Sequence, residues 1–202
     1  WIAAQDRINL LNDKIIFLKT HSALCRLENN SFTNKNNTKA VIYIVRDPRN
    51  LITSFSHHYS LNIDQAFDFI NDKKTMVLTN EYGVGDFGIA TVLGNWSEHY
   101  KSWQNIKFAP ILVIKYEDLI KDTKNTFILI LNFLKTLMDI RIDEKKIINT
   151  VDSCSFEKLA EKEKTEGFVE SVSSKKNLKK LNFFYLGKKN DWKKLLDPKI
   201  EE

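Results

Sequence analysis

Short apolar runs alternate along the chain with segments in which apolar residues recur at helical spacing. Three runs are continuous and rich in β-branched residues, as is typical of buried parallel strands: Lys14–Lys19, Ala40–Val45 and Ile111–Lys115. Strands that alternate with helices form an α/β sheet, and such sheets bind ligands at the carboxyl ends of their strands. The residues that follow these three runs are therefore the first candidates for function.

Two predicted helices have clear start signals. Asp47 is placed to cap a helix that begins at Pro48 and extends to about Tyr59. Asp122 is placed to cap an apolar helix over about 123–137. The apolar spacing predicts further helices over four ranges: Ile2–Leu11, Thr91–Trp103, Asp143–Val151 and Phe156–Lys162.

The segment Ser60–Gly94 has no clear period. Its closely spaced glycines Gly83, Gly85 and Gly88 suit a loop that faces a substrate and suit a long surface connection equally well. No repeat, low-complexity tract or linker divides the chain. We therefore expect one domain over residues 1–202.

The composition narrows the class of protein. With 43% hydrophobic residues, 6 Gly and 3 Pro, the chain is typical of a globular domain and not of a disordered or fibrous one. The apolar run Phe127–Leu134 is interrupted by Asn132 and is far shorter than the roughly 20 residues of a membrane span, so we expect no membrane segment. Cys25 and Cys154 are too few for a disulfide framework and lack the spacing of metal ligands. We expect a cytoplasmic protein without a metal.

The formal net charge of +5 is concentrated between Lys175 and Lys199, where aromatic side chains are interleaved among lysines. Such a segment suits binding to single-stranded nucleic acid or to a phosphorylated small molecule. It is equally typical of a solvated lysine surface. Composition alone does not separate these alternatives.

The most informative motif follows the second predicted strand and reads Arg-Asp-Pro-Arg, beginning at Arg46. The next helix begins with free N–H groups that favour an anion, and Ser54 lies two turns along it. A guanidinium and a hydroxyl at this point are suited to phosphate oxygens. In the alternative, Arg46 pairs with Asp47 or Asp118 and Ser54 has no special role. The residues alone support both interpretations.

This motif resembles the signature of the sulfotransferases that use 3′-phosphoadenosine-5′-phosphosulfate (PAPS). Further segments match the same family in order along nearly the whole chain: Lys19-Thr20-His21, Asn95-Trp96, Leu112–Leu119 with its Tyr-Glu-Asp-Leu, and Ser153–Leu159 with its Ser-Phe-Glu. The resemblance implies an α/β fold of three αβα layers around a central parallel sheet, like that of the P-loop nucleotide hydrolases.

The resemblance also implies a role for each matching residue. His21 would be the catalytic base, and Lys19 would assist at the transferring group. Arg46 and Ser54 would hold the 3′-phosphate of PAPS. The remaining cofactor-binding residues by resemblance are Trp1, Tyr116, Cys154 and Phe156 at the adenine, and Gly187 near the C-terminus. Lys188 is also an expected cofactor-binding residue, as a substitute for a family cation.

The chemistry of these residue types fits sulfuryl transfer. The transition state is loose and in-line, so positioning and charge stabilisation dominate catalysis. A histidine with a pKa near about 6.5 can remove the acceptor's proton at neutral pH, and a lysine can stabilise negative charge. Taken alone, a histidine after a strand is more often structural. His57 and His58 are adjacent on a predicted helix and point in different directions, so they are not expected to share a metal.

The chain departs from the family pattern in two places. The family's phosphosulfate loop, a Pro-Lys-Ser-Gly-Thr-Thr run, precedes the Trp that matches Trp1, so we expect this chain to lack it. Tyr185 and Leu186 stand where the family has Arg and Lys, and Asn190 stands at a glycine position. Lys188 or Lys189 would then have to supply the charge, without the planar fork of an arginine.

We therefore predict a sulfotransferase that moves a sulfuryl group from PAPS to a hydroxyl or amine of a small-molecule or glycan acceptor, with His21 as general base. The alternative is a nucleotide-binding protein of the same fold with impaired catalysis. A third hypothesis, a basic binder of polyanions, rests only on the lysine-rich segment, and the prediction includes no nucleic-acid partner. The acceptor and the oligomeric state stay open, with a homodimer as one option.

Overall fold

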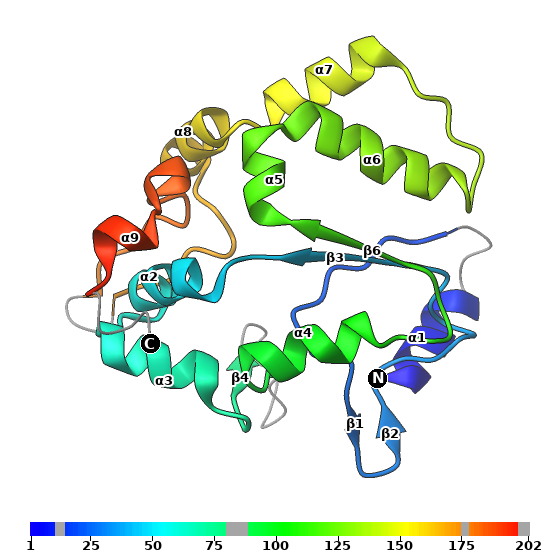
Figure 1. The fold of residues 1–202 in the computed structure, drawn as a ribbon, viewed down its shortest axis with the longest axis horizontal. Coiled ribbons are helices and arrows are strands. Elements are labelled where there is room, and N and C mark those ends of the chain that lie inside the picture. Colours follow the sequence, from blue (N-terminus) through cyan, green and yellow to red (C-terminus); the bar gives the residue numbers. More distant parts are fainter. Residues whose placement is uncertain (11–14, 80–88, 175–177, 198–202) are drawn as a thin grey trace. The chain divides into compact units, whose positions relative to one another are not determined.

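The computed structural model describes residues 1–10, 15–79, 89–174 and 178–197 (Figure 1). The chain forms two compact units, and each is described by itself. Unit 1 comprises Trp1–Tyr43 and Phe69–Val113, and unit 2 comprises Ile44–Asp68 and Ile114–Glu202.

Strands β3 (Val41–Val45) and β6 (Ile111–Lys115) pair with each other, and their arrows point the same way in Figure 1. They confirm two of the three strands that the apolar runs predict. Each strand is followed closely by a helix, α2 (Pro48–Tyr59) after β3 and α5 (Tyr116–Lys121) after β6. The backbone N–H of Asp47 donates to the Glu117 carboxylate at 3.1 Å and joins the two strand–helix turns.

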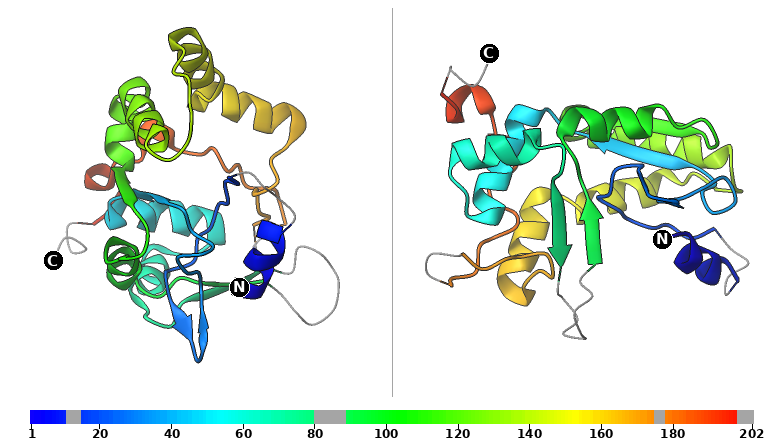
Figure 2. Two further views of the ribbon diagram at one scale, coloured as in Figure 1. Left: turned by 90° about the vertical axis from the view of Figure 1, so that its right-hand side faces the viewer. Right: turned by 90° about the horizontal axis from the view of Figure 1, so that it is seen from below.

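Unit 1 contains two small antiparallel sheets, a helix at each end of its sequence and a compact core. One sheet pairs β1 (Arg26–Leu27) with β2 (Asn30–Ser31), and the other pairs β4 (Met76–Thr79) with β5 (Ile89–Val92), as Figure 2 shows. Its helices are α1 (Ile2–Leu10) and α4 (Trp96–Gln104). Its buried apolar side chains are Ala23, Ile70, Trp103 and Ile106.

Unit 2 is mainly helical. Helix α3 (Ile63–Asn71) begins in it, and the later elements are α6 (Thr123–Lys135), α7 (Glu144–Ser153), α8 (Phe156–Glu166), the 3-10 turn η1 (Gly187–Lys189) and α9 (Trp192–Leu195). Helices α5 and α7 both pack on α6. The buried apolar side chains are Ile52, Ala66, Ile114 and Ile147.

Side-chain caps explain why several helices begin where the sequence predicts. Asp47 accepts a hydrogen bond from the backbone N–H of Arg49 at 2.9 Å, and Pro48 is the first residue of α2. Asp122 caps α6 in the same way, through the N–H of Asn125 at 3.2 Å. Both predicted starts are confirmed. Helices α1, α7 and α8 lie within a few residues of the predicted ranges.

The predicted strand Lys14–Lys19 is wrong in the part that the structure describes. Residues 15–19 form no strand there, and the side chains of Phe17 and Leu18 are each 64% exposed. A strand requires a hydrogen-bonded neighbour, which an apolar run by itself does not supply. Lys14 lies outside the described residues.

The prediction that Ser60–Gly94 lacks regular structure is also wrong in part. It contains helix α3 and the β4–β5 pair, whereas Gly83, Gly85 and Gly88 lie outside the described residues. The helix predicted over Thr91–Trp103 begins only at Trp96, because residues 91–92 belong to β5. Asn95 caps that helix by accepting from the N–H of Glu98 at 2.8 Å.

A buried carboxylate fixes the chain between α8 and η1. Glu163 is 8% exposed and accepts hydrogen bonds from the backbone N–H groups of Phe183 and Phe184, at 2.6 and 2.9 Å, and from the Ser171 hydroxyl. The Phe168 ring lies 4.8 Å from that of Phe183 and 5.2 Å from that of Phe184. Glu163 and these rings thus hold the residues that lead into η1.

Gly187 begins η1 with a φ of 53°, and it approaches the ring of Phe156 closely. A Cβ at this position would lie 2.8 Å from Phe156 Cζ, which is closer than atoms in van der Waals contact allow. Both the backbone angle and the ring therefore require glycine here.

No helix in the described part of the chain is long and apolar enough to cross a membrane.

Glu163→Gln is expected to lower the free energy of unfolding by about 1–3 kcal/mol at pH 7, because an amide cannot accept all the hydrogen bonds that converge on the carboxylate. Burial opposes the charge, but the bonds from Ser171, Phe183 and Phe184 outweigh it and lower the pKa of Glu163 from its usual 4.5. The stabilisation is therefore present above about pH 4.5 and is lost as the pH falls through the folded-state pKa.

Urea unfolding at pH 7 and at a series of acidic pH values measures this difference. The control is Glu161→Gln on the same helix, where the exposed Glu161 pairs with Lys164, and it should leave stability nearly unchanged. Equal stability of Glu163→Gln and the original chain at pH 7 would contradict the anchoring role.

Gly187→Ala is expected to destabilise unit 2 by about 1–2 kcal/mol through its backbone angle, with the overlap on Phe156 adding to this. Phe156→Leu in the same chain should recover the part due to overlap. A double-mutant cycle in urea separates the two effects, and a coupling energy of at least about 0.5 kcal/mol is expected. Additive losses would show that the ring does not restrict residue 187.

Candidate functional site

Arg46 lies immediately after β3 and reaches Ser54 on α2. Its Nη1 donates to Ser54 Oγ at 3.2 Å, and its guanidinium carbon lies 4.5 Å from the ring centroid of Tyr116. Burial lowers the pKa of Arg46, while Tyr116, Glu117 and Asp47 act in the opposite direction, and a guanidinium stays charged in proteins. The structure thus brings Arg46 and Ser54 together as the anion hypothesis requires.

The neighbouring Arg49 is engaged elsewhere in the same turn. Its guanidinium donates to both carboxylate oxygens of Asp47, at 3.0 and 2.8 Å, and lies 3.8 Å from the centroid of the Trp192 ring. The hydrogen bond from the Arg49 side chain is the main reason that the pKa of Asp47 is lowered. Asp47 therefore remains an ionised cap at the start of α2.

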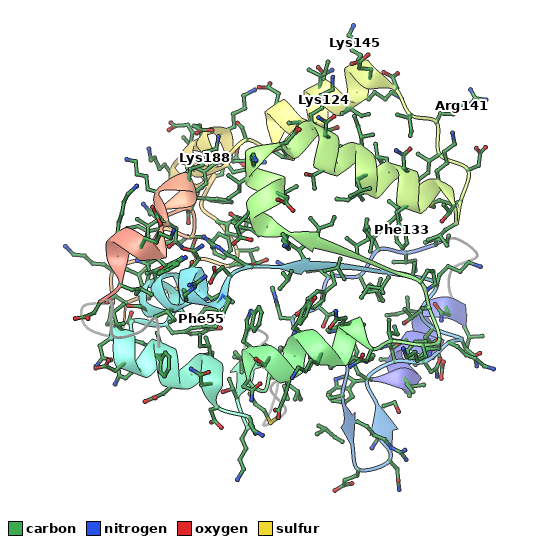
Figure 3. The ribbon with its side chains drawn as sticks, viewed as in Figure 1. Phe55, Lys124, Phe133, Arg141, Lys145 and Lys188 are labelled. Carbon is green, nitrogen blue, oxygen red and sulfur yellow. The ribbon has the colours of Figure 1, made fainter. Side chains whose placement is uncertain are left out.

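A cavity of about 400 Å³ opens beside Arg46. Its cationic lining residues, Arg46, Lys121 and Lys188, outnumber its one carboxylate, that of Glu117, so it favours an anionic ligand. Figure 3 labels Lys188, which lies on η1. The complete lining is Arg46, Asn50, Tyr116, Glu117, Ile120, Lys121, Gly187, Lys188 and Asn190.

The resemblance-derived residues of unit 2 lie mostly at this cavity. Three of them line it, Arg46, Tyr116 and Gly187, and so does Lys188, the lysine expected to substitute for a family cation. Ser54 contacts Arg46, and Phe156 packs against Gly187. Cys154 is exposed at the carboxyl end of α7 and does not line the cavity. Its role at the nucleotide stays a prediction.

His21 belongs to unit 1, where helix α4 fixes its backbone. His99 Nε2 lies 3.1 Å from the His21 carbonyl oxygen, and His99 Nδ1 lies 2.8 Å from the Tyr43 hydroxyl. A carbonyl can only accept, so Nε2 carries the proton and Nδ1 accepts from Tyr43. This arrangement uses a neutral His99, and burial lowers the pKa of that imidazole accordingly.

Further contacts from α4 hold the residues that follow His21. Trp103 Nε1 donates to the Ser22 carbonyl and Ser102 Oγ accepts from the Leu24 N–H, both at 3.0 Å. The His21 side chain itself is exposed, as is that of Lys19. The motif Lys-Thr-His therefore ends on a backbone that hydrogen bonds from α4 hold, while the side chains of Lys19 and His21 are exposed.

Trp1 also belongs to unit 1, where it packs on an aromatic side chain. Its ring lies 5.4 Å from that of Phe32 in an edge-to-face arrangement, and Phe32 meets Trp103 at 5.9 Å in the same way. Stacking of Trp1 on an adenine stays a prediction.

The sequence analysis missed several residues at these sites. Asn50 and Lys121 line the cavity, and Asn190, noted only as a departure from the family, lines it too. Asn50 lies four residues before Ser54 on one helix face, so helical spacing could have identified it. No local signal marks His99 as the partner of a residue 78 positions away. Within the described ranges, His, Cys, Asp and Glu side chains form no cluster of three or more that could hold a metal.

Known proteins resemble this chain in sequence and in fold. Residues 3–202 match the family model described as "Sulfotransferase domain". Human Sulfotransferase 1C2 is 28% identical over 179 residues, which cover 87% of this chain and 54% of the relative. The 3-alpha-hydroxysteroid sulfotransferase of Cavia porcellus is 29% identical over 96 residues, or 46% of this chain and 30% of the relative. The chain thus spans about half, or less, of the length of these relatives.

Among solved structures, mouse sulfotransferase SULT7A1 complexed with PAP matches with a TM-score of 0.52 and 22% sequence identity. The match covers 83% of this chain and 55% of that one. This likeness shows the fold, and it confirms the predicted α/β class with αβα layers around a parallel sheet. Because the family model spans nearly every residue, the chain belongs to the sulfotransferase domain family.

Proposed function

We propose that this protein transfers a sulfuryl group from PAPS to a hydroxyl or amine of a small-molecule or glycan acceptor. One observation carries the proposal. Arg46, Tyr116 and the Gly187–Lys188 pair come from three distant parts of the sequence and line one cavity of unit 2. The family pattern assigns Arg46, Tyr116 and Gly187 to the nucleotide. Lys188 is a neighbouring cation that can replace the charge of the family's Arg-Lys pair, which this chain lacks. Chance would not be expected to gather these residues.

The cavity has the properties that a phosphorylated nucleotide requires. Its volume of about 400 Å³ is within the range of roughly 300–1,000 Å³ that is usual for small-ligand sites. Arg46 offers a planar fork for phosphate oxygens, with the Ser54 hydroxyl beside it, and Tyr116 offers a flat ring. In this assignment Arg46 and Ser54 hold the 3′-phosphate, and Lys188 supplies charge from the C-terminal segment.

The proposed chemistry assigns the proton transfer to His21. When bound, PAPS supplies the sulfuryl group, whose bond to the nucleotide phosphate breaks as the acceptor oxygen or nitrogen bonds to sulfur. His21 accepts the proton that the acceptor loses, and Lys19 stabilises negative charge at the transferring group. The hydrogen bond from His99 holds the His21 backbone in place for this step.

The known relatives support the same proposal. The solved mouse sulfotransferase is complexed with PAP, and one relative is named for a hydroxysteroid.

The proposal further places the protein in the cytoplasm and includes neither a metal nor a nucleic-acid partner. Both cysteines are free thiols, as a reducing compartment would keep them.

His21→Ala is expected to lower sulfuryl transfer by at least about 100-fold, because a positioned general base contributes that much or more. The measurement is formation of 3′,5′-ADP from PAPS in the presence of a panel of phenols, alcohols and amines. Affinity for 3′,5′-ADP, measured by calorimetry, should stay unchanged in the variant. Turnover by His21→Ala at the original rate would contradict its role. Nucleotide binding by the original chain without turnover on any acceptor would favour the catalytically impaired alternative.

Arg46→Ala is expected to weaken binding of 3′,5′-ADP by about 10–100-fold, because it removes charge-assisted hydrogen bonds. Binding of 5′-ADP, which lacks the 3′-phosphate, should change far less. Arg49→Ala is the matched control, since Arg49 lies in the same turn but contacts Asp47 and Trp192. Calorimetric titration of both variants with both nucleotides makes the comparison, and equal losses for the two nucleotides in Arg46→Ala would overturn the assignment.

A further inference from the structure

The side chain of Asn190, one residue after η1, makes three hydrogen bonds to helix α2. Its Nδ2 donates to the Asn50 carbonyl and to Ser54 Oγ, each at 3.0 Å. Its Oδ1 accepts from the Thr53 hydroxyl at 2.5 Å. Because the Asn50 carbonyl can only accept, these partners fix which end of the amide faces which group.

These contacts determine what the Ser54 hydroxyl can offer to a ligand. A hydroxyl has one hydrogen to donate and two lone pairs that accept. Ser54 Oγ accepts from Arg46 Nη1 at 3.2 Å and from Asn190 Nδ2 at 3.0 Å, so both lone pairs are engaged. Only its hydrogen remains, and that hydrogen points to the Asn50 carbonyl at 3.2 Å. Ser54 is thus arranged to act toward a ligand as a donor.

Asn190 also makes the hydrogen of Ser54 available. Rotation about the Cβ–Oγ bond turns that hydrogen toward an anion and moves the lone pairs with it, so the bond from Arg46 Nη1 is exchanged for one from Arg46 to the anion. The Asn50 carbonyl keeps the hydrogen bond from Asn190 Nδ2 and does not lose its last side-chain donor, so the reorientation is favourable when an anion is present. A glycine, which the family pattern has here, could make none of these three bonds.

Asn190 is also part of the proposed nucleotide site itself. It lines the cavity together with Arg46 and Lys188, and its amide is uncharged. A neutral donor fits beside a phosphate, whereas a carboxylate of the same shape would repel it.

We infer that Asn190 is a positioning residue for the 3′-phosphate subsite: it holds Ser54 as a hydrogen-bond donor and thereby sets the preference for nucleotides that carry a 3′-phosphate. The inference rests on the proposed function, which it deepens by adding a specificity residue that the family pattern does not contain.

The test compares Asn190→Ala and Asn190→Asp in calorimetric titrations with 3′,5′-ADP and 5′-ADP at neutral pH. The measured quantity is the ratio of the two affinities, which a general loss of folding would not change. Asn190→Ala should reduce the preference for 3′,5′-ADP by about tenfold, the effect of one good hydrogen bond. The isosteric Asn190→Asp should reduce it by about 100-fold, because its carboxylate neither donates to Ser54 nor tolerates a neighbouring phosphate.

Trp192→Leu is the matched control. It removes the contact with Arg49 in the same C-terminal segment but leaves the Asn190 amide intact, so it should change both affinities equally. An unchanged preference in Asn190→Ala and Asn190→Asp, or equal losses for both nucleotides, would overturn the inference. An original chain that lacks the preference altogether would instead overturn the proposed function, so the two failures are distinguishable.

Discussion

The hydrogen bonds between helix α2 and Asn190 are the constraint on which the cavity of unit 2 depends. Arg46 and Tyr116 are placed by strand ends, but Gly187 and Lys188 come from a segment with little regular structure. Asn190 in that segment is 140 residues from its partner Asn50 on α2. Ordering such a segment is opposed by the loss of backbone entropy. The three bonds of Asn190, the bond from the Trp192 N–H to Asn50 Oδ1 at 3.0 Å and the Glu163 anchor offset that loss. Without these contacts, the segment that contains Lys188 would not be held at the cavity.

In the same segment, a residue that departs from the family pattern makes a packing contact instead. Tyr185, at a position where the family has arginine, stacks on His57 with ring centroids 3.8 Å apart and an interplanar angle of 3°. His57 Nε2 also lies 2.9 Å from the Asn182 carbonyl oxygen, so α2 is joined to this segment at a second place. Tyr185 thus contributes packing where the family has a charge. The cations that line the cavity are Arg46, Lys121 and Lys188.

The sequence predicted those elements that depend only on residues adjacent in the chain. The start of α2, which Asp47 caps, and the β-branched run of β3 are of this kind, and both are confirmed. The run 15–19 has the same apolar character but forms no strand, because strand formation depends on a neighbour that its own residues do not specify. The bonds of Asn190 to α2 and of His99 to His21 join residues far apart in the sequence, and only the folded chain reveals them. The resemblance to the family motifs identified Arg46 and Ser54 as site residues. It did not identify Asn190, which holds Ser54 in place.

The central claim is that unit 2 forms a site for a nucleotide with a 3′-phosphate. Its most direct test is a calorimetric titration of the unaltered chain with 3′,5′-ADP and with 5′-ADP at moderate salt. The account predicts that 3′,5′-ADP binds at least about tenfold more tightly, because the additional phosphate meets Arg46 and the oriented Ser54 hydroxyl. Equal affinity for the two nucleotides, or binding of neither, would contradict it.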